Sequence, residues 1–364
     1  MIVVGADTHK DTHTAVAVDA ATGQVLDELT APARRRGHIS HLDWARGLAA
    51  GDELVWAIED CRHVSGGLER FLVAAGAKVV RVPPKLMGAS RKGERRRGKS
   101  DPIDATNVAR AALQEGVETL PGADLDEEAM EIKLLADHRE DLVRSRAQDQ
   151  QRLRWHLHEI DPDYEIPAGA LNHEVWLKRI AGRLSRGEQS ARIRVARDLL
   201  RSIRASVKRA RELEREIAAL VEAKAPALVA IPGCGAMTAA KIVSETAGAA
   251  EFGSDAKLAR LAGVAPIPAS SGRSDRHRLD RGGNRQLNCA LHRIAITQGR
   301  IDERARSYLA KKQAEGKSRM EALRCLKRQL ARVVWQALRT DAPATSPSLL
   351  DSPKLRPVGE LALT

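Results

Sequence analysis

Four acidic residues have the spacing expected of a metal-dependent phosphoryl-transfer site. Asp7 and Glu59 end two short apolar runs, and Asp101 and Asp104 lie one turn apart on one face of a helix that should begin at Asp101. Hard divalent cations such as Mg²⁺ bind carboxylate oxygens and can stabilise the attacking and leaving oxygens of a phosphodiester. The set predicts such a site. Taken singly, Asp101 could cap the helix, Asp104 could interact favourably with the helix dipole, and Asp7 could close a turn.

A second segment, residues 261–285, could supply a nucleophile. Ser270 and Ser271 precede Gly272, and a tight turn there would expose a serine hydroxyl. Arginines that could hold a phosphodiester follow at Arg273, Arg276, Arg278, Arg281 and Arg285. A covalent role for the serine and simple phosphate binding by the loop are equally supported, because no histidine or acid is fixed beside the serine.

The elements that must position these residues begin with a mixed sheet. Residues 2–6, 14–18 and 24–30 should form a three-stranded antiparallel meander. A helix at 38–49, a strand at 53–59, a helix at 67–75 and a strand at 78–82 should follow. This order is typical of a ribonuclease H-like sheet. Sugar-kinase and actin-like ATPases share it, but they need glycines in the first turn, and residues 7–13 contain none.

Beyond residue 100 the pattern is mainly helical. Long helices are expected at 126–160 and 190–223, and the second carries an apolar stripe at steps of three and four. Its residues are Ile193, Ala196, Leu200, Ile203, Val207, Ala210, Leu213, Ile217 and Leu220. A helical hairpin or dimerising coiled coil and an intramolecular bundle explain the stripe equally well.

A third helical region should begin at Pro226. Gly233 and Gly235 form a turn before a helix at 237–246, and this turn resembles half of a helix-hairpin-helix element, whose backbone N–H groups can bind phosphate. An ordinary turn between helices is the alternative. The predicted divisions are a catalytic α/β domain at 1–125, a helical oligomerisation region at 126–225, a mainly helical C-terminal domain at 226–340 and a disordered, proline- and serine-rich tail at 341–364.

The charge of the chain indicates a polyanionic partner. Its 364 residues include 60 Lys and Arg against 48 Asp and Glu, a net charge of +12. Residues 85–99, 260–300 and 301–339 carry +6, +6 and +7, so the rest of the chain carries −7. This clustering is typical of nucleic-acid binding. In the first zone we expect contacts from Arg95, Arg96, Arg97 and Lys99.

Composition also excludes several classes. With only 5 Trp, 2 Tyr and 2 Phe the chain lacks material for base-stacking platforms, so its partner should be gripped by the backbone. The 4 cysteines lie too far apart for a zinc knuckle or a disulfide framework. Neither a signal peptide nor a membrane-spanning stretch is visible, so we expect a cytoplasmic protein without a membrane partner.

In combination these motifs resemble one family, the DEDD/serine transposases of insertion sequences, which are bridge-RNA-guided recombinases. The resemblance runs collinearly over residues 2–339. It rests on residues 4–13, the strand end at Ile58-Glu59, residues 99–105, the turn Ile231-Pro232-Gly233, and Ser270-Ser271-Gly272 followed by Gly283-Asn284-Arg285.

The resemblance implies a RuvC-like N-terminal domain, a coiled-coil middle and a C-terminal transposase domain. It implies that Asp7, Glu59, Asp101 and Asp104 bind the metal and that Ser271, which directly precedes glycine, forms a phosphoserine link to DNA. Ser270 is the alternative nucleophile. Donor and target DNA, a structured guide RNA and a dimeric or tetrameric assembly with sites shared between subunits are the implied partners. A RuvC-like junction resolvase using activated water and a non-catalytic DNA-binding protein remain alternatives.

Overall fold

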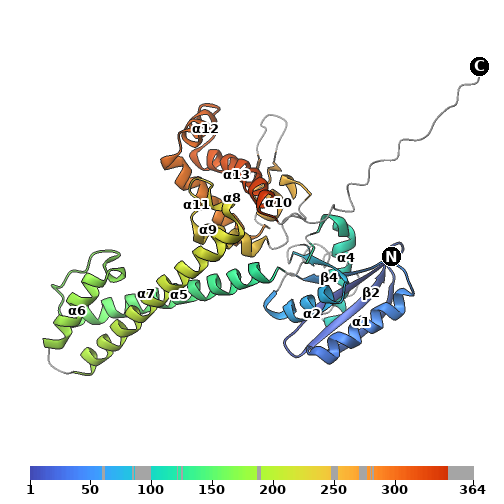
Figure 1. Cartoon of the computed structure of the whole chain (residues 1–364), viewed down its shortest axis with the longest axis horizontal. Helices are drawn as coiled ribbons and strands as arrows, with labels where there is room; N and C mark the ends of the chain where they lie inside the picture. The colour runs from blue at the N-terminus through green and yellow to red at the C-terminus, as the bar shows by residue number, and fades with distance from the viewer. Residues whose placement is uncertain are drawn as a thin grey trace, which may run out of the picture.

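The computed structural model describes residues 1–59, 62–83, 86, 100–120, 122–123, 126–186, 190–246, 253–269, 277–278, 280 and 283–342. A sheet domain, a long helical arm and a helical C-terminal unit are its three visible parts (Figure 1). No helix among these residues is both long and apolar enough to cross a membrane.

The sheet domain contains five strands in the order β3-β2-β1-β4-β5. They are β1 (Ile2–Thr8), β2 (Thr12–Asp19), β3 (Val25–Pro32), β4 (Leu54–Glu59) and β5 (Lys78–Val82). The first three form an antiparallel meander, whereas β4 lies parallel to β1 and β5 parallel to β4. The predicted mixed α/β sheet is therefore confirmed.

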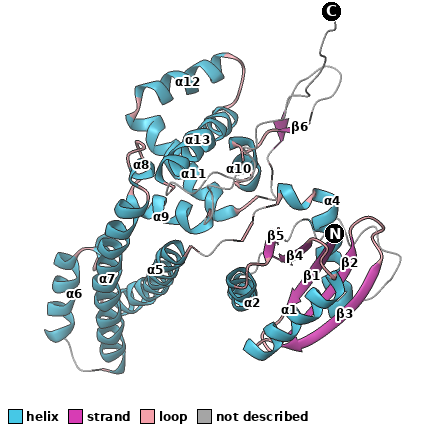
Figure 2. Cartoon of the chain, turned by 45° about the vertical axis from the view of Figure 1, so that its right-hand side comes forward, coloured by secondary structure: helices cyan, strands magenta, loops and turns pink. Residues whose placement is uncertain are grey.

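Helices cover both faces of this sheet. Strand residues alternate between faces, so Val4 and Trp56 pack on Leu42 of α1 (Arg35–Ala49) and Leu68 of α2 (Arg62–Ala74). On the opposite face, Val3, Ala57 and Val80 pack on α4 (Asp101–Glu115), whose buried side chains include Ala105 and Val108. The three helices lie as two layers around the sheet (Figure 2). This packing places the N-terminal end of α4 at the carboxyl ends of the parallel strands.

The arm is an antiparallel pair of long helices, α5 (Glu127–Ile160) and α7 (Ala191–Lys224), with α6 (Glu174–Arg186) at its tip (Figure 1). Interhelical pairs run in reverse order along it: Lys224 with Asp126, Arg139 with Glu214, and Arg192 with Glu159. The predicted stripe of α7 is buried as far as Ile217, but Val221 rather than Leu220 completes it. Packing inside one chain accounts for this stripe, and a dimerising coiled coil stays a prediction.

The C-terminal unit comprises α8 (Pro226–Val229), α9 (Ala236–Glu245), α10 (Asp255–Leu261), α11 (Arg285–Ile301), α12 (Glu303–Ala314) and α13 (Arg319–Asp341). Its core also takes in the near ends of the arm, including Ile132 of α5 and Ile217 of α7. The arm is thus anchored in the C-terminal core. Most of the predicted tail, from residue 343 onward, lies outside the described residues.

Candidate active site

Strand register places the first two predicted acids side by side. Ala6 of β1 pairs with Ile58 of the parallel strand β4, so the next residues, Asp7 and Glu59, are neighbours across the two strands. Alternation directs both toward the face covered by α4, since Val3 and Ala57 are buried there. The carboxyl ends of parallel strands therefore present two carboxylates to the helix layer.

A glycine brings the other two acids to the same place. An ideal Cβ on Gly5 would lie 2.1 Å from the carbonyl oxygen of Ala105 and 2.6 Å from the amide nitrogen of Ala109. Helix α4 therefore rests directly on the β1 backbone, a contact that only glycine allows. Asp101 and Asp104 lie in the first turn of that helix, where its dipole favours negative charge. Their carboxylates are thus held above the end of β1.

Three side chains converge closely. Nε2 of His9 lies 3.1 Å from Oδ2 of Asp7 and 3.5 Å from Oδ1 of Asp101. Among the described residues, Asp7, His9 and Asp101 form a group whose candidate ligand atoms all lie within 4.8 Å of one another. Asp104 is close enough to act electrostatically on Asp7. Asp101 is exposed and Asp7 is partly buried, so the group opens to solvent.

The electrostatics of this group suit a divalent cation. Burial raises the pKa of Asp7, His9 opposes the rise, and repulsion from Asp104 and Asp101 adds to it. A divalent cation relieves such repulsion, so the carboxylates of this group fit one. The structure thus brings Asp7, Asp101 and Asp104 together, and it places Glu59 beside Asp7 by strand register.

Two residues lie differently from what the sequence pattern alone indicates. Asp101 is not the N-cap of α4, because Ser100 occupies that position and Asp101 is the first helical residue, before Pro102. His9, which the sequence pattern did not assign to the site, lies within it. The only sequence signal for His9 was its place two residues after Asp7, just beyond the end of β1.

The two ends of the serine segment are held together by a glycine clamp, formed by Gly263 and Gly283. A Cβ on Gly283 would lie 2.1 Å from the backbone nitrogen of Gly263, and the amide of Asn284 donates to the carbonyl of Leu261 at 2.6 Å. Two short strands, β6 (Ile267–Pro268) and β7 (His277–Arg278), pair antiparallel above this clamp. Ser270, Ser271, Arg273 and Arg276 belong to the connection between them and lie outside the described residues, as do Arg281, Arg95, Arg96, Arg97 and Lys99.

The remaining predicted nucleic-acid contacts can be placed. Arg278 is exposed on β7, and Arg285 is exposed at the first position of α11. Gly233 has a φ of +81°, and a Cβ there would lie 3.0 Å from Cβ of Thr297, so packing against α11 already explains this glycine. Gly235 is the exposed N-cap of α9 and has open space around it. Phosphate binding at this turn stays a prediction.

The fold is a mixed sheet with carboxylates gathered at the carboxyl ends of its parallel strands. Two family descriptions match the chain: the IS110 DEDD transposase over residues 4–162, and "Transposase IS116/IS110/IS902 family" over residues 225–310. Together they cover the sheet domain from residue 4 onward, all of α5, and the C-terminal unit as far as α12.

Relatives match over most of their length. An IS110 insertion-element protein of Streptomyces coelicolor is 30% identical over 73% of this chain and 76% of its own. An IS116 protein of Streptomyces clavuligerus is 29% identical over 93% of this chain and 94% of its own. An IS900 protein of Mycobacterium paratuberculosis is 28% identical over 82% of this chain and 87% of its own. The chain therefore belongs to the IS110/IS116/IS902 family of DEDD transposases, and it is a DNA transposase.

Among solved structures, a Thermus thermophilus RuvC bound to a Holliday junction substrate matches 34% of this chain and 99% of its own, at 13% identity and a TM-score of 0.26.

Proposed function

We propose that this transposase cuts and rejoins DNA through a covalent phosphoserine, with Ser271 as nucleophile and with Asp7, Glu59, Asp101 and Asp104 as the ligands of Mg²⁺. The observation that carries the proposal is the convergence of Asp7 and Asp101 within one ligand group, with Asp104 acting on Asp7 and Glu59 next to it in register. Such a carboxylate set suits phosphoryl transfer.

The proposed chemistry conserves the energy of the phosphodiester. When bound, the cation supplies positive charge to the phosphoryl oxygens. The Ser271 oxygen bonds to phosphorus, the bond from phosphorus to one sugar oxygen breaks, and the serine proton passes to solvent while the leaving oxygen is protonated. Attack by a sugar hydroxyl from another strand then restores a diester and frees the serine. A covalent link is favoured over water attack because rejoining then needs no external energy.

A structured RNA selects the DNA sites in this proposal. The chain has 9 aromatic residues in 364 and an excess of 12 positive charges, a composition suited to gripping backbones rather than reading bases. Base pairing by RNA would supply the sequence choice that such a protein lacks. Sequencing the RNA that co-purifies with the protein tests this part: a discrete RNA from the flank of the gene supports it, and bulk cellular RNA refutes it.

Each active site is completed by another subunit. In one chain, Arg260 of α10 pairs with Glu115 at 2.6 Å, and Lys257 donates to the carbonyl oxygen of Glu118. These contacts are at the C-terminal end of α4, about 20 Å along the helix from Asp101 at a rise of about 1.5 Å per residue. The serine segment starts just after α10, and in this proposal it joins the carboxylate set of a different subunit.

A trapped adduct tests the chemistry. Ser271→Ala should abolish both excision from a plasmid and the denaturation-resistant protein–DNA adduct, whereas Ser270→Ala is the matched control and should retain both. The same cleavage without any adduct in the wild-type protein would establish attack by water and refute the covalent step.

The carboxylates are tested separately. Asp101→Asn should abolish Mg²⁺-dependent cleavage but leave DNA binding nearly intact, because Asp101 is exposed and contributes no packing. Glu59→Gln should behave in the same way. Cleavage at wild-type rate by both variants would refute the metal-binding role of this set.

A further inference from the structure

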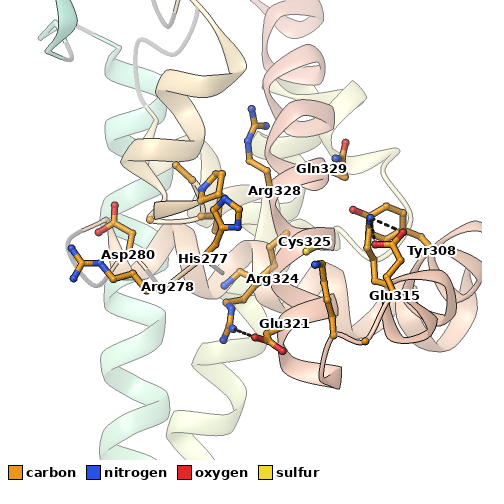
Figure 3. Close-up of a pocket in the computed structure, with 18 residues that line it drawn as sticks. His277, Arg278, Asp280, Tyr308, Glu315, Glu321, Arg324, Cys325, Arg328 and Gln329 are labelled. Carbon is orange, nitrogen blue, oxygen red and sulfur yellow. Dashed lines mark hydrogen bonds and ion pairs between the residues drawn. The ribbon is translucent and has the colours of Figure 1, made fainter. Parts of the chain in front are cut away.

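A cavity of about 460 Å³ lies beneath the serine-bearing hairpin. Its walls come from the hairpin, from the turn between α12 and α13, and from α13 itself. Figure 3 shows Arg278 on the hairpin side and Arg324 on the α13 side, with Tyr308 on a third side of the space. The cavity is therefore formed by segments that the C-terminal fold brings together around the base of the serine loop.

Positive charge predominates in this lining, and part of it is already neutralised. Lys312 pairs with Glu315 at 2.8 Å and Arg328 pairs with Asp255 at 2.8 Å. Arg324 and Glu321 form a looser, partly exposed pair at 3.7 Å. Lys327 differs, because its side chain is 6% exposed and, within the part of the chain that the structure describes, it has no ion pair. A buried ammonium without an anion is costly, so its presence calls for an explanation.

Lys327 is tied to the base of the hairpin. Its Nζ donates to Oδ1 of Asn288 at 2.5 Å, and Nδ2 of Asn288 donates to the carbonyl oxygen of Ala262 at 2.7 Å. Ala262 directly precedes Gly263, one half of the glycine clamp. Asn288 therefore fixes Lys327 relative to the loop that carries the serines, while the remaining ammonium protons can serve a ligand. Burial lowers the pKa of Lys327, and the charge of Arg324 adds to this.

We propose that this cavity binds a phosphate of the DNA backbone, with Lys327 as its buried cation and Lys317 and Arg324 completing the contact. A phosphodiester supplies the single negative charge and the acceptor oxygens that Lys327 lacks. Lys317, half-buried in the turn between α12 and α13, also has no ion pair among the described residues. The inference rests on the proposed function only in taking nucleic acid as the ligand.

Binding without chemistry tests the cavity. Full-length protein in EDTA is titrated with a fluorescent DNA duplex of unrelated sequence, and with an RNA duplex of the same sequence, over a range of salt concentrations. Lys327→Met keeps an unbranched side chain that is one atom shorter, and it removes the charge. We expect it to weaken DNA binding by about 10- to 100-fold, the range for one charge-assisted hydrogen bond. The slope of log K against log salt should also fall by about 1, as for one lost phosphate contact.

Matched variants separate this contact from general charge and from misfolding. Lys311→Met removes the same charge from an exposed position of α12 outside the cavity, and its slope should equal that of the wild type. Lys317 lies outside the core, so the Lys317→Met protein should fold even if the Lys327→Met protein does not. It should also reduce the slope of log K against log salt.

Wild-type slopes for both Lys317→Met and a folded Lys327→Met would overturn the inference. A reduced slope only with RNA would assign the phosphate to RNA and overturn the assignment to DNA. Because no metal or serine reaction takes part, failure to trap a phosphoserine adduct would refute the proposed function without changing these slopes.

Discussion

Gly5→Ala should disable the site without altering any carboxylate. The new Cβ would lie 2.1 Å from the carbonyl oxygen of Ala105, whereas ordinary contact begins at 3.4 Å, so α4 must move away by about 1.3 Å. That helix carries Asp101, and a displacement of about 1 Å in a catalytic group can lower a rate by about 100-fold. Overpacking of this kind also costs about 1–3 kcal/mol of unfolding free energy. We therefore expect DNA cleavage to fall by about two orders of magnitude.

The assay is plasmid excision at several Mg²⁺ concentrations, together with urea unfolding. Gly47→Ala is the matched control, because Gly47 lies within α1, has nothing within 4 Å of its ideal Cβ, and gains helix propensity on substitution. Its activity should be unchanged. If Gly5→Ala cleaved DNA at the wild-type rate, the position of α4 on β1 would not control the carboxylates, and the account given for the site would be refuted.

Three further predictions concern stability, each read by urea denaturation. Burial, with repulsion from neighbouring histidines, lowers the pKa of His13 to about 4. As the pH falls below 6.5, the unfolded chain therefore binds a proton at this histidine before the folded chain does. The unfolding free energy should drop by about 2 kcal/mol between pH 7 and pH 5, and by less in His13→Gln. Glu69→Gln leaves Arg81 buried without its carboxylate and should cost about 3 kcal/mol; a loss under about 1 kcal/mol would contradict this. Asn284→Ala removes the cap that accepts from two amides of α11 and should cost about 1–2 kcal/mol; an unchanged unfolding free energy would contradict this.

Much of the sheet domain could be predicted from the sequence because its strands alternate and its turns are short. The end of β5 was predicted to the residue, and β4 differs from its prediction by one residue. Helix α6 was missed although Leu177, Ile180 and Leu184 have helical spacing, because it follows a proline-broken segment. The two-residue strands β6 and β7 are too short for any periodic pattern.

The candidate site was predictable only where strand order determines proximity. Asp7 and Glu59 end strands that the fold class makes neighbours, so their register follows from topology. His9 lies in the turn after β1, where no period fixes the direction of a side chain. Asn288 and Lys327 are 39 residues apart on different helices, and their hydrogen bond depends on how α11 packs on α13. Contacts between side chains on different helices, such as this one, can be found only from the packed structure.

Mixing two inactive variants decides whether the site is shared between subunits. Asp101→Asn chains retain the serine, and Ser271→Ala chains retain the carboxylates. If both halves came from one chain, every site in a mixed oligomer would lack one of them, and no product would form. If they come from different subunits, about a quarter of the sites in a random one-to-one mixture are complete. With sites shared between subunits, as proposed, excision should reappear on mixing, at up to that fraction of wild-type activity. Absence of product from a mixture shown to contain mixed oligomers would place both halves in the same chain.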